Sequence, residues 1–209
     1  MKRILVLSLV VFGVVAFSAN AGATNMLGTM ELNLGYAKSS TEVGSSTESM
    51  EGGLTFGASY WRNATPTISW GAEVSFDNMG TLDNSYYDPF FATTINEEYS
   101  TKVFRVNPAV RMNFGAPVGP SFYLQGGAGL YNVSWDYSYS DGTLMATEDG
   151  SSSKLGVNFG AGVGFPVGPK TKLNFTGSYH MVSGVEVAGA NLTDNSNYLQ
   201  LRAGIGFGL

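Results

Sequence analysis

Strict two-residue alternation of side-chain character, repeated eight times, constrains the fold of this chain more than any other feature. Between Ile68 and Asp77, for example, apolar side chains alternate with Ser, Gly, Glu and Asp. A period of two places successive side chains on opposite faces of an extended strand, whereas a helix would show a period near 3.6 residues. The pattern recurs at residues 30–37, 53–61, 68–77, 104–114, 122–131, 155–165, 172–181 and 198–209. We therefore predict an all-β fold of eight antiparallel strands.

Two kinds of connection alternate between these segments. The short ones carry proline, which is favoured in tight turns, and lie at residues 62–66, 115–120 and 166–170. The long ones are rich in Ser, Thr, Asn, Asp and Gly, as solvated loops are, and lie at residues 39–52, 78–101, 138–153 and 182–197. Short turns at one end and long loops at the other predict an up-and-down meander, with both chain ends on the side of the short turns.

Either a soluble β-sandwich or a closed membrane barrel would show this alternation, and the polarity of the two faces separates them. The polar face holds few charges and many of the 28 glycines, such as Gly160, Gly162 and Gly164. Glycine is entropically costly on a solvent face, but inside a narrow barrel it lets the wall curve while larger side chains opposite fill the space. Aromatic residues of the apolar face gather near the strand ends, as in the girdles of transmembrane barrels. These features favour an eight-stranded transmembrane β-barrel.

The N-terminus has the order of a secretory signal peptide. Lys2 and Arg3 precede an apolar run from Ile4 to Phe17, and small residues follow it. The run is shorter than the roughly 20 residues that a membrane-spanning helix needs. We predict a signal peptide over residues 1–21, with cleavage after Ala21 or after Ala23, and one barrel domain over residues 22–209.

Composition excludes several functional classes. Without cysteine, the chain cannot form a disulfide scaffold or a thiolate metal site. A single histidine disfavours a zinc enzyme, and the net charge of −5 disfavours nucleic acid, which requires a basic face. We expect no cofactor, no metal and no catalytic residue.

A resemblance to a known family follows from these motifs. The ending Tyr198-Leu-Gln-Leu-Arg-Ala-Gly-Ile-Gly-Phe-Gly-Leu209, the turns at 114–120 and 165–169 and the eight-strand meander resemble the small outer-membrane β-barrels that include the OmpA membrane domain and OmpX. This resemblance implies a monomer in the outer membrane of a Gram-negative cell, in contact with lipid and lipopolysaccharide. It also implies insertion by the barrel-assembly machinery, which reads a C-terminal aromatic residue. This chain has Phe207 near its end and terminates in Leu209.

Charged residues on the polar face are the main candidates for chemistry in the barrel interior, the lumen. They are Glu31, Glu73, Asp77, Arg105, Arg111, Lys172 and Arg202. Because an unpaired buried charge is costly, the acids and bases are expected to pair as a structural network. The alternatives are a gate, in which exchange of partners opens a narrow ion path, and a small-molecule carrier similar to OmpW. An eight-stranded interior is nearly filled by side chains, which disfavours the free passage of metabolites.

His180 raises the distant alternative of a lipid A hydrolase, because some eight-stranded barrels are lipid A deacylases. Ser178 lies two residues before the histidine, whereas that family places its serine two residues after it, where this chain has Val182. Alternation also directs His180 into the lumen, away from lipid acyl chains.

The long connections form the remaining functional surface. They hold most of the acidic residues, together with an aromatic cluster of Tyr86, Tyr87, Phe90 and Phe91. An exposed aromatic patch often marks a partner interface. The main functional hypothesis is therefore a structural or surface-binding, adhesion-like role through acidic extracellular loops, with a host or cell-surface ligand as the partner.

Two positions break the regular pattern. Pro108 lies within a strand and removes a ladder hydrogen bond, which predicts a bulge or a local widening. Near Asn132 the apolar phase passes to Val133, Trp135 and Tyr137, which predicts a strand that projects beyond the membrane and shifts register at a bulge.

Overall fold

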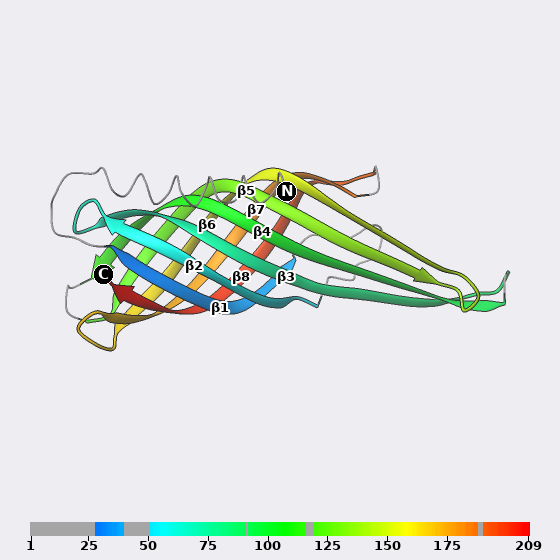
Figure 1. Cartoon of the computed structure of the whole chain (residues 1–209), viewed down its shortest axis with the longest axis horizontal. Coiled ribbons are helices and arrows are strands. Elements are labelled where there is room, and N and C mark those ends of the chain that lie inside the picture. The colour runs from blue at the N-terminus through cyan, green and yellow to red at the C-terminus, as the bar shows by residue number, and fades with distance from the viewer. Residues whose placement is uncertain (1–27, 40–50, 91, 116–118, 188–189) are drawn as a thin grey trace.

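The computed structural model describes residues 28–39, 51–90, 92–115, 119–187 and 190–209, and the predicted signal peptide lies outside this set. Eight antiparallel strands close into a barrel in chain order, which confirms the predicted fold (Figure 1). The strands are β1 (Thr29–Ser39), β2 (Gly53–Asn63), β3 (Ile68–Asp88), β4 (Thr93–Gly115), β5 (Ser121–Ser140), β6 (Met145–Pro166), β7 (Thr171–Val187) and β8 (Ala190–Gly208). The described part of the chain contains no helix long and apolar enough to cross a membrane.

The barrel closes where the first strand meets the last. β1 pairs with β8 from Thr29 opposite Gly208 to Ser39 opposite Tyr198. The backbone N–H of Leu209 donates to the carbonyl of Gly28 at 2.9 Å, so both ends of the barrel domain lie together. They lie at the end that carries the short connections, here called the turn end (Figure 1). The opposite end is called the hairpin end.

A continuous apolar belt covers the outward face of the barrel. On β5 it runs from Phe122 to Leu130, a length that matches the 9 to 11 residues of a tilted strand crossing a bilayer. Leu130 is paired with Leu155 of β6, and the next outward pair, Asn132 and Ser153, is polar. The apolar belt therefore ends at the same level on neighbouring strands, as expected where lipid gives way to water.

Four strands continue beyond the belt at the hairpin end and form one antiparallel sheet (Figure 1). This projecting sheet comprises residues 81–88 of β3, 93–102 of β4, 132–140 of β5 and 145–154 of β6. At 3.3 Å per residue, ten residues of strand add about 30 Å. The prediction of loops at 78–101 and 138–153 is therefore wrong, and so is that of a loop at 182–197, where β7 and β8 continue to pair as far as Val187 and Ala190. Polar side chains on a strand in water have the same composition as a loop, while ladder hydrogen bonds satisfy the backbone.

The predicted irregularity at Pro108 is confirmed as a local widening, whereas the bulge predicted near Asn132 is wrong. At Pro108 the β4–β5 pairing is interrupted opposite Ala128 but resumes in the same register, so only a local widening occurs. β5 passes Asn132 without any shift of register. A register shift instead lies between Asn78 and Thr81 of β3, where Gly80 adopts a φ of +83° that favours glycine.

Candidate functional site: a packed lumen and a projecting sheet

The lumen holds six of the seven predicted charged residues in four ion pairs. These pairs are Arg105–Glu73, Arg105–Asp77, Arg111–Glu31 and Arg202–Glu73. All six residues are buried, at 6% exposure or less. Three carboxylates thus face three guanidinium groups in the space that the barrel wall encloses.

Asp77 of β3 is the centre of this lumen network. Its carboxylate, which is fully buried, accepts hydrogen bonds from five side chains on four strands: Thr55, Ser75, Arg105, Tyr198 and Gln200. The Tyr198 hydroxyl donates at 2.8 Å and Gln200 Nε2 at 2.6 Å. Because Tyr198 and Gln200 lie on β8, these bonds connect the last strand to β3 across the lumen. So many charge-assisted bonds to one carboxylate hold the barrel wall in a single arrangement.

Arg111 of β4 makes the second cross-lumen connection. Its guanidinium binds the Glu31 carboxylate of β1 with both terminal nitrogens, at 2.7 and 3.0 Å. The same group lies between two aromatic rings, 3.9 Å from the centroid of Trp61 and 4.1 Å from that of Tyr123. A bidentate pair between two rings combines planar hydrogen bonding with cation–π attraction.

The seventh predicted charge, Lys172, is not in the network. It lies near the start of β7 opposite Pro166 and is exposed at the turn end. No carboxylate of the described residues pairs with it. Alternation identified the correct face of the strand but not the height along it, and at this height the lumen opens to water.

His180 points into the lumen, as alternation predicts, and is fully buried. Nδ1 lies 3.1 Å from the Tyr131 hydroxyl and Nε2 lies 3.3 Å from Gln200 Oε1. The ring stacks on Tyr198 with centroids 4.3 Å apart. No hydrogen bond connects His180 to Ser178 within the described residues, so the geometry offers no pair of nucleophile and base facing a lipid substrate.

An apolar cluster closes the lumen above the network, toward the hairpin end. This outer plug consists of Ala37, Met79, Val103, Tyr131, Val133, Trp135, Val182 and Tyr198. Leu82, Tyr99 and Tyr137 of the projecting sheet pack against it. The shift of apolar residues from one strand face to the other at Asn132 therefore reflects a change of environment. Above that level the inside of the barrel is apolar and its outside faces water. Gly156 makes room for the plug, since a Cβ there would lie 2.7 Å from the Tyr131 ring.

Because the network and the outer plug fill the lumen in series, we predict that the barrel does not conduct ions in discrete steps. The measurement is a planar-bilayer recording of the refolded protein beside Arg111→Ala. Steps of fixed size in the wild type that change in Arg111→Ala would contradict the packed lumen and favour the gate.

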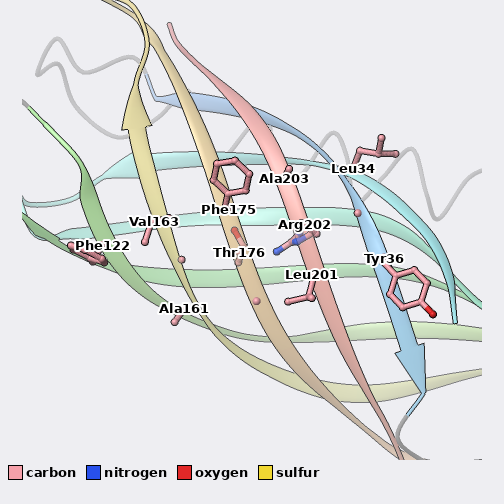
Figure 2. A pocket seen from close by; sticks show the side chains of 13 residues that line it. Leu34, Tyr36, Phe122, Ala161, Val163, Phe175, Thr176, Leu201, Arg202 and Ala203 are labelled. Atoms are coloured by element: carbon pink, nitrogen blue, oxygen red, sulfur yellow. The ribbon is translucent and has the colours of Figure 1, made fainter. Parts of the chain in front are cut away.

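A hollow of about 690 Å³ lies on the outward face over β5 to β8 and β1 (Figure 2). Its floor is formed by small residues, Ala161 paired with Gly177, and Ala203 beside them. Large side chains such as Phe175 and Leu201 surround it (Figure 2). Most of its lining belongs to the apolar belt, but Thr176 and Arg202 of the lumen face also line it (Figure 2).

The distal edge of the projecting sheet carries the most exposed apolar side chains of the described residues. Phe90, between β3 and β4, is 88% exposed, and Met145, at the start of β6, is 80% exposed. Tyr87 and Leu144 lie beside them at 62% and 68%. We call these four residues the tip patch. The pattern of the sequence did not single out Leu144 and Met145. The feature that could have identified them is two adjacent apolar residues inside a polar connection.

Two of the predicted aromatic residues that the structure describes, Tyr86 and Tyr87, do not share one face of the sheet. Tyr86 and Tyr87 are neighbours on a strand and so point to opposite faces of the sheet. Tyr86 lies opposite the buried Ile95, on the face that continues from the lumen. Phe91 lies outside the described residues.

One hydrogen bond joins the two hairpin tips, and two more order the turn between β5 and β6. The Thr93 hydroxyl donates to the carbonyl of Asp141 at 2.5 Å. The Asp141 carboxylate accepts from the backbone N–H groups of Leu144 and Thr143, which lowers the pKa of this carboxyl. The tip patch is therefore presented on ordered turns.

The projecting sheet is strongly acidic. Between residues 81–102 and 132–154 the chain has two lysines, Lys102 and Lys154, and eight acids: Asp83, Asp88, Glu97, Glu98, Asp136, Asp141, Glu148 and Asp149. Four of these acids form two directly opposed pairs, Asp83 with Glu98 and Asp149 with Asp136. Lys102 pairs with Asp136 at 3.0 Å. Within the described residues, no three metal-ligating side chains come close enough to hold an ion.

Comparison with known proteins supports the same architecture. The family model described as outer membrane protein beta-barrel domain matches residues 4–208. Neisserial surface protein A is 16% identical, with a TM-score of 0.56 over 90% of this chain and 100% of that one. A major outer membrane protein from Thermus thermophilus is 14% identical, with a TM-score of 0.52 over 87% and 99%. Ail of Yersinia pestis is 19% identical, with a TM-score of 0.46 over 87% and 100%. A search of curated proteins gives no match.

Proposed function

We propose that this chain, which belongs to the outer membrane protein beta-barrel domain family, is a non-enzymatic surface-binding protein of the outer membrane. The barrel anchors it, and the projecting sheet carries the contact surface. The proposal rests on the division between a packed lumen, whose acidic and basic groups pair with one another, and a sheet that extends about 30 Å into water. In this proposal outer-membrane lipid surrounds the apolar belt, and Lys38 and Lys102 at its upper edge contact lipopolysaccharide phosphates.

The tip patch is the single observation that carries this proposal. Phe90 and Met145 are more exposed than any large apolar side chain of the belt, although they lie in water and not in lipid. Exposed apolar patches rimmed by polar residues mark interaction sites, because leaving them in water is unfavourable. A partner that covers the patch would gain the free energy of removing it from water.

The charge of the sheet narrows the class of partner. With eight acids and two lysines, the projecting sheet would repel a polyanion. It would therefore not suit a ligand such as sucrose octasulfate, the heparin analogue with which Ail has been solved. We propose a partner that is neutral or basic and has apolar groups to cover the tip patch.

We predict that Phe90→Ser combined with Met145→Ser lowers adhesion of cells that display the protein roughly tenfold or more, because exposed apolar anchors dominate such contacts. The assay counts adherent cells on an epithelial monolayer and on immobilised matrix protein. Thr94→Ala with Thr147→Ala is the matched control, since both residues are exposed on the same sheet. Equal adhesion of the tip variant and the control would exclude the tip patch as the contact.

A further inference from the structure

The turn end of the barrel is basic, in contrast to the acidic projecting sheet. This end comprises the short connections and the adjoining strand ends, at residues 28–30, 62–68, 113–121, 165–172 and 205–209. These residues include three cations, Arg62, Lys170 and Lys172, and no aspartate or glutamate. When the projecting sheet lies outside the cell, the turn end faces the periplasm. Charge of one sign at the end of a lumen attracts ligands of the opposite sign.

Two of these cations border the mouth of the lumen. Lys172 lies on the lumen face of β7, directly opposite Gly206 of β8. Lys170 precedes β7, and its carbonyl accepts a hydrogen bond from the N–H of Gly208 at 2.7 Å. Both lysines are exposed, and no carboxylate of the described residues forms an ion pair with either of them. Because Gly206 and Gly208 have no side chains, the wall beside the two lysines is left uncovered.

A buried donor without a partner lies just inside this mouth. Asn174, two residues after Lys172 on the same face of β7, is 3% exposed, and its Nδ2 has no hydrogen-bond partner among the described residues. Nδ2 lies 3.2 Å from the position that a Cβ would take at Gly206, so the amide group is directed at the space over that glycine. A buried donor is unfavourable when it is unpaired, and an acceptor supplied by a ligand would satisfy it.

One acid also borders the space over Gly206. Glu31 lies opposite this glycine on β1, and its Cγ is 3.3 Å from the same Cβ position. Both oxygens of the Glu31 carboxylate are bound by the terminal nitrogens of Arg111, at 2.7 and 3.0 Å. This ion pair compensates the negative charge of Glu31. The charges of Lys170 and Lys172 are therefore in excess at the mouth.

We propose that the recess bordered by Lys170, Lys172, Asn174 and Gly206 binds a phosphate group. The two ammonium groups supply charge and freely rotating donors, and Asn174 Nδ2 supplies one directed donor. A phosphate group suits this set because it has several acceptor oxygens, which can meet donors on two sides at once. The group belongs either to a phospholipid of the inner leaflet or to free phosphate, since both present the same oxygens. The recess lies at the opposite end of the barrel from the tip patch and is independent of the proposed adhesion.

The test follows the side-chain amide of Asn174 by NMR, in full-length protein with isotope-labelled asparagine. A maltoside detergent keeps the sample free of phosphate, and the spectrum of Asn174→Ala identifies the signal. One arm titrates inorganic phosphate, and the other titrates dibutyryl phosphatidylglycerol, a short-chain phospholipid. We expect the Asn174 signal to shift and saturate. A shift with inorganic phosphate shows that the phosphate group alone is sufficient, and a shift with the lipid alone identifies a phospholipid as the ligand.

Two variants with matched controls separate the recess from unspecific attraction. Lys172→Gln should weaken binding about tenfold, as expected when one charge-assisted hydrogen bond is lost. Its control is Lys38→Gln, which removes an exposed lysine of β1 at the hairpin end and should leave binding unchanged. Gly206→Ala places a methyl group 3.2 Å from Asn174 Nδ2 and should also weaken binding about tenfold or more. Its control is Gly177→Ala, whose methyl group would meet only Leu201, at 3.4 Å.

The absence of a saturable shift with both ligands would overturn the proposal, because water would then be the partner of Asn174. Equal affinities of Lys172→Gln and Lys38→Gln, or of Gly206→Ala and Gly177→Ala, would overturn it as well. Heat-modified migration on gels verifies that each variant is folded, and Lys172→Gln keeps the test decisive if Gly206→Ala does not fold. These outcomes are separate from those of the adhesion assay, because none of these substitutions touches the projecting sheet.

Discussion

Replacing Arg105 with alanine should destabilise the barrel by about 3 to 5 kcal/mol, the usual cost of removing one partner from a buried ion pair. Arg105 contacts two carboxylates at 3.2 Å, those of Glu73 and Asp77, and none of the three side chains is more than 2% exposed. Its removal leaves both carboxylates buried with fewer donors. Asp77 would still accept hydrogen bonds from Tyr198 and Gln200, but no cation of the described residues would remain beside it.

The free energy of unfolding can be measured by urea titration in lipid vesicles, with tryptophan fluorescence as the signal. Lys102→Ala is the control, because it removes the exposed pair with Asp136, and exposed pairs contribute about 0 to 1 kcal/mol. If Arg105→Ala costs no more than Lys102→Ala, water must replace the lost guanidinium. The lumen would then be wet, and the gate would regain support.

The order and pairing of the strands could be predicted from sequence because a membrane barrel offers each strand only two environments. Ile68 to Asp77 shows this directly: Ser69, Glu73 and Asp77 are buried in the lumen, while Ile68 faces outward. One residue of slip would place every carboxylate in lipid, so the sequence pattern and the register determine each other.

Height along the barrel could not be predicted in the same way. Lys172 lies on the lumen face but at the open turn end, and Val133 and Trp135 lie on the lumen face at the level of the outer plug. Alternation shows which face of a strand a residue occupies, but not how far along the barrel axis it lies. It therefore predicts a change of register at Asn132, where the structure has a change of environment. Comparing outward pairs across strands, such as Leu130 with Leu155 and Asn132 with Ser153, gives the level.

The tip patch was only partly predictable for a related reason. Tyr87 and Phe90 stand out as aromatic residues in a polar segment. Leu144 and Met145 lie more than 50 residues later in the chain, and they reach the tip only because β5 and β6 continue as strands beside β3 and β4. Interpreting 78–101 and 138–153 as loops gives no reason to bring these residues to the same end. The hydrogen bond from Thr93 to Asp141 shows that the two hairpins do meet there.

Removing the distal half of the projecting sheet separates the anchoring role of the barrel from the binding role of the sheet. Leu82, Tyr99, Tyr137 and Glu148 lie opposite one another in one row across β3 to β6. Two-residue Asn-Gly turns can therefore replace Asp83–Glu98 and Ser138–Thr147 without changing the register. The cut lies above the outer plug, and we expect the free energy of unfolding to stay within about 1 kcal/mol of the wild type.

The most direct test of the account is the adhesion of cells that display this truncated barrel, compared with cells that display the full-length protein in equal amounts. Equal display is verified by surface labelling, and folding by heat-modified migration on gels. We predict that adhesion falls to the level of cells without the protein while the barrel stays folded. Unchanged adhesion of cells that display the folded, truncated barrel would contradict the assignment of binding to the projecting sheet.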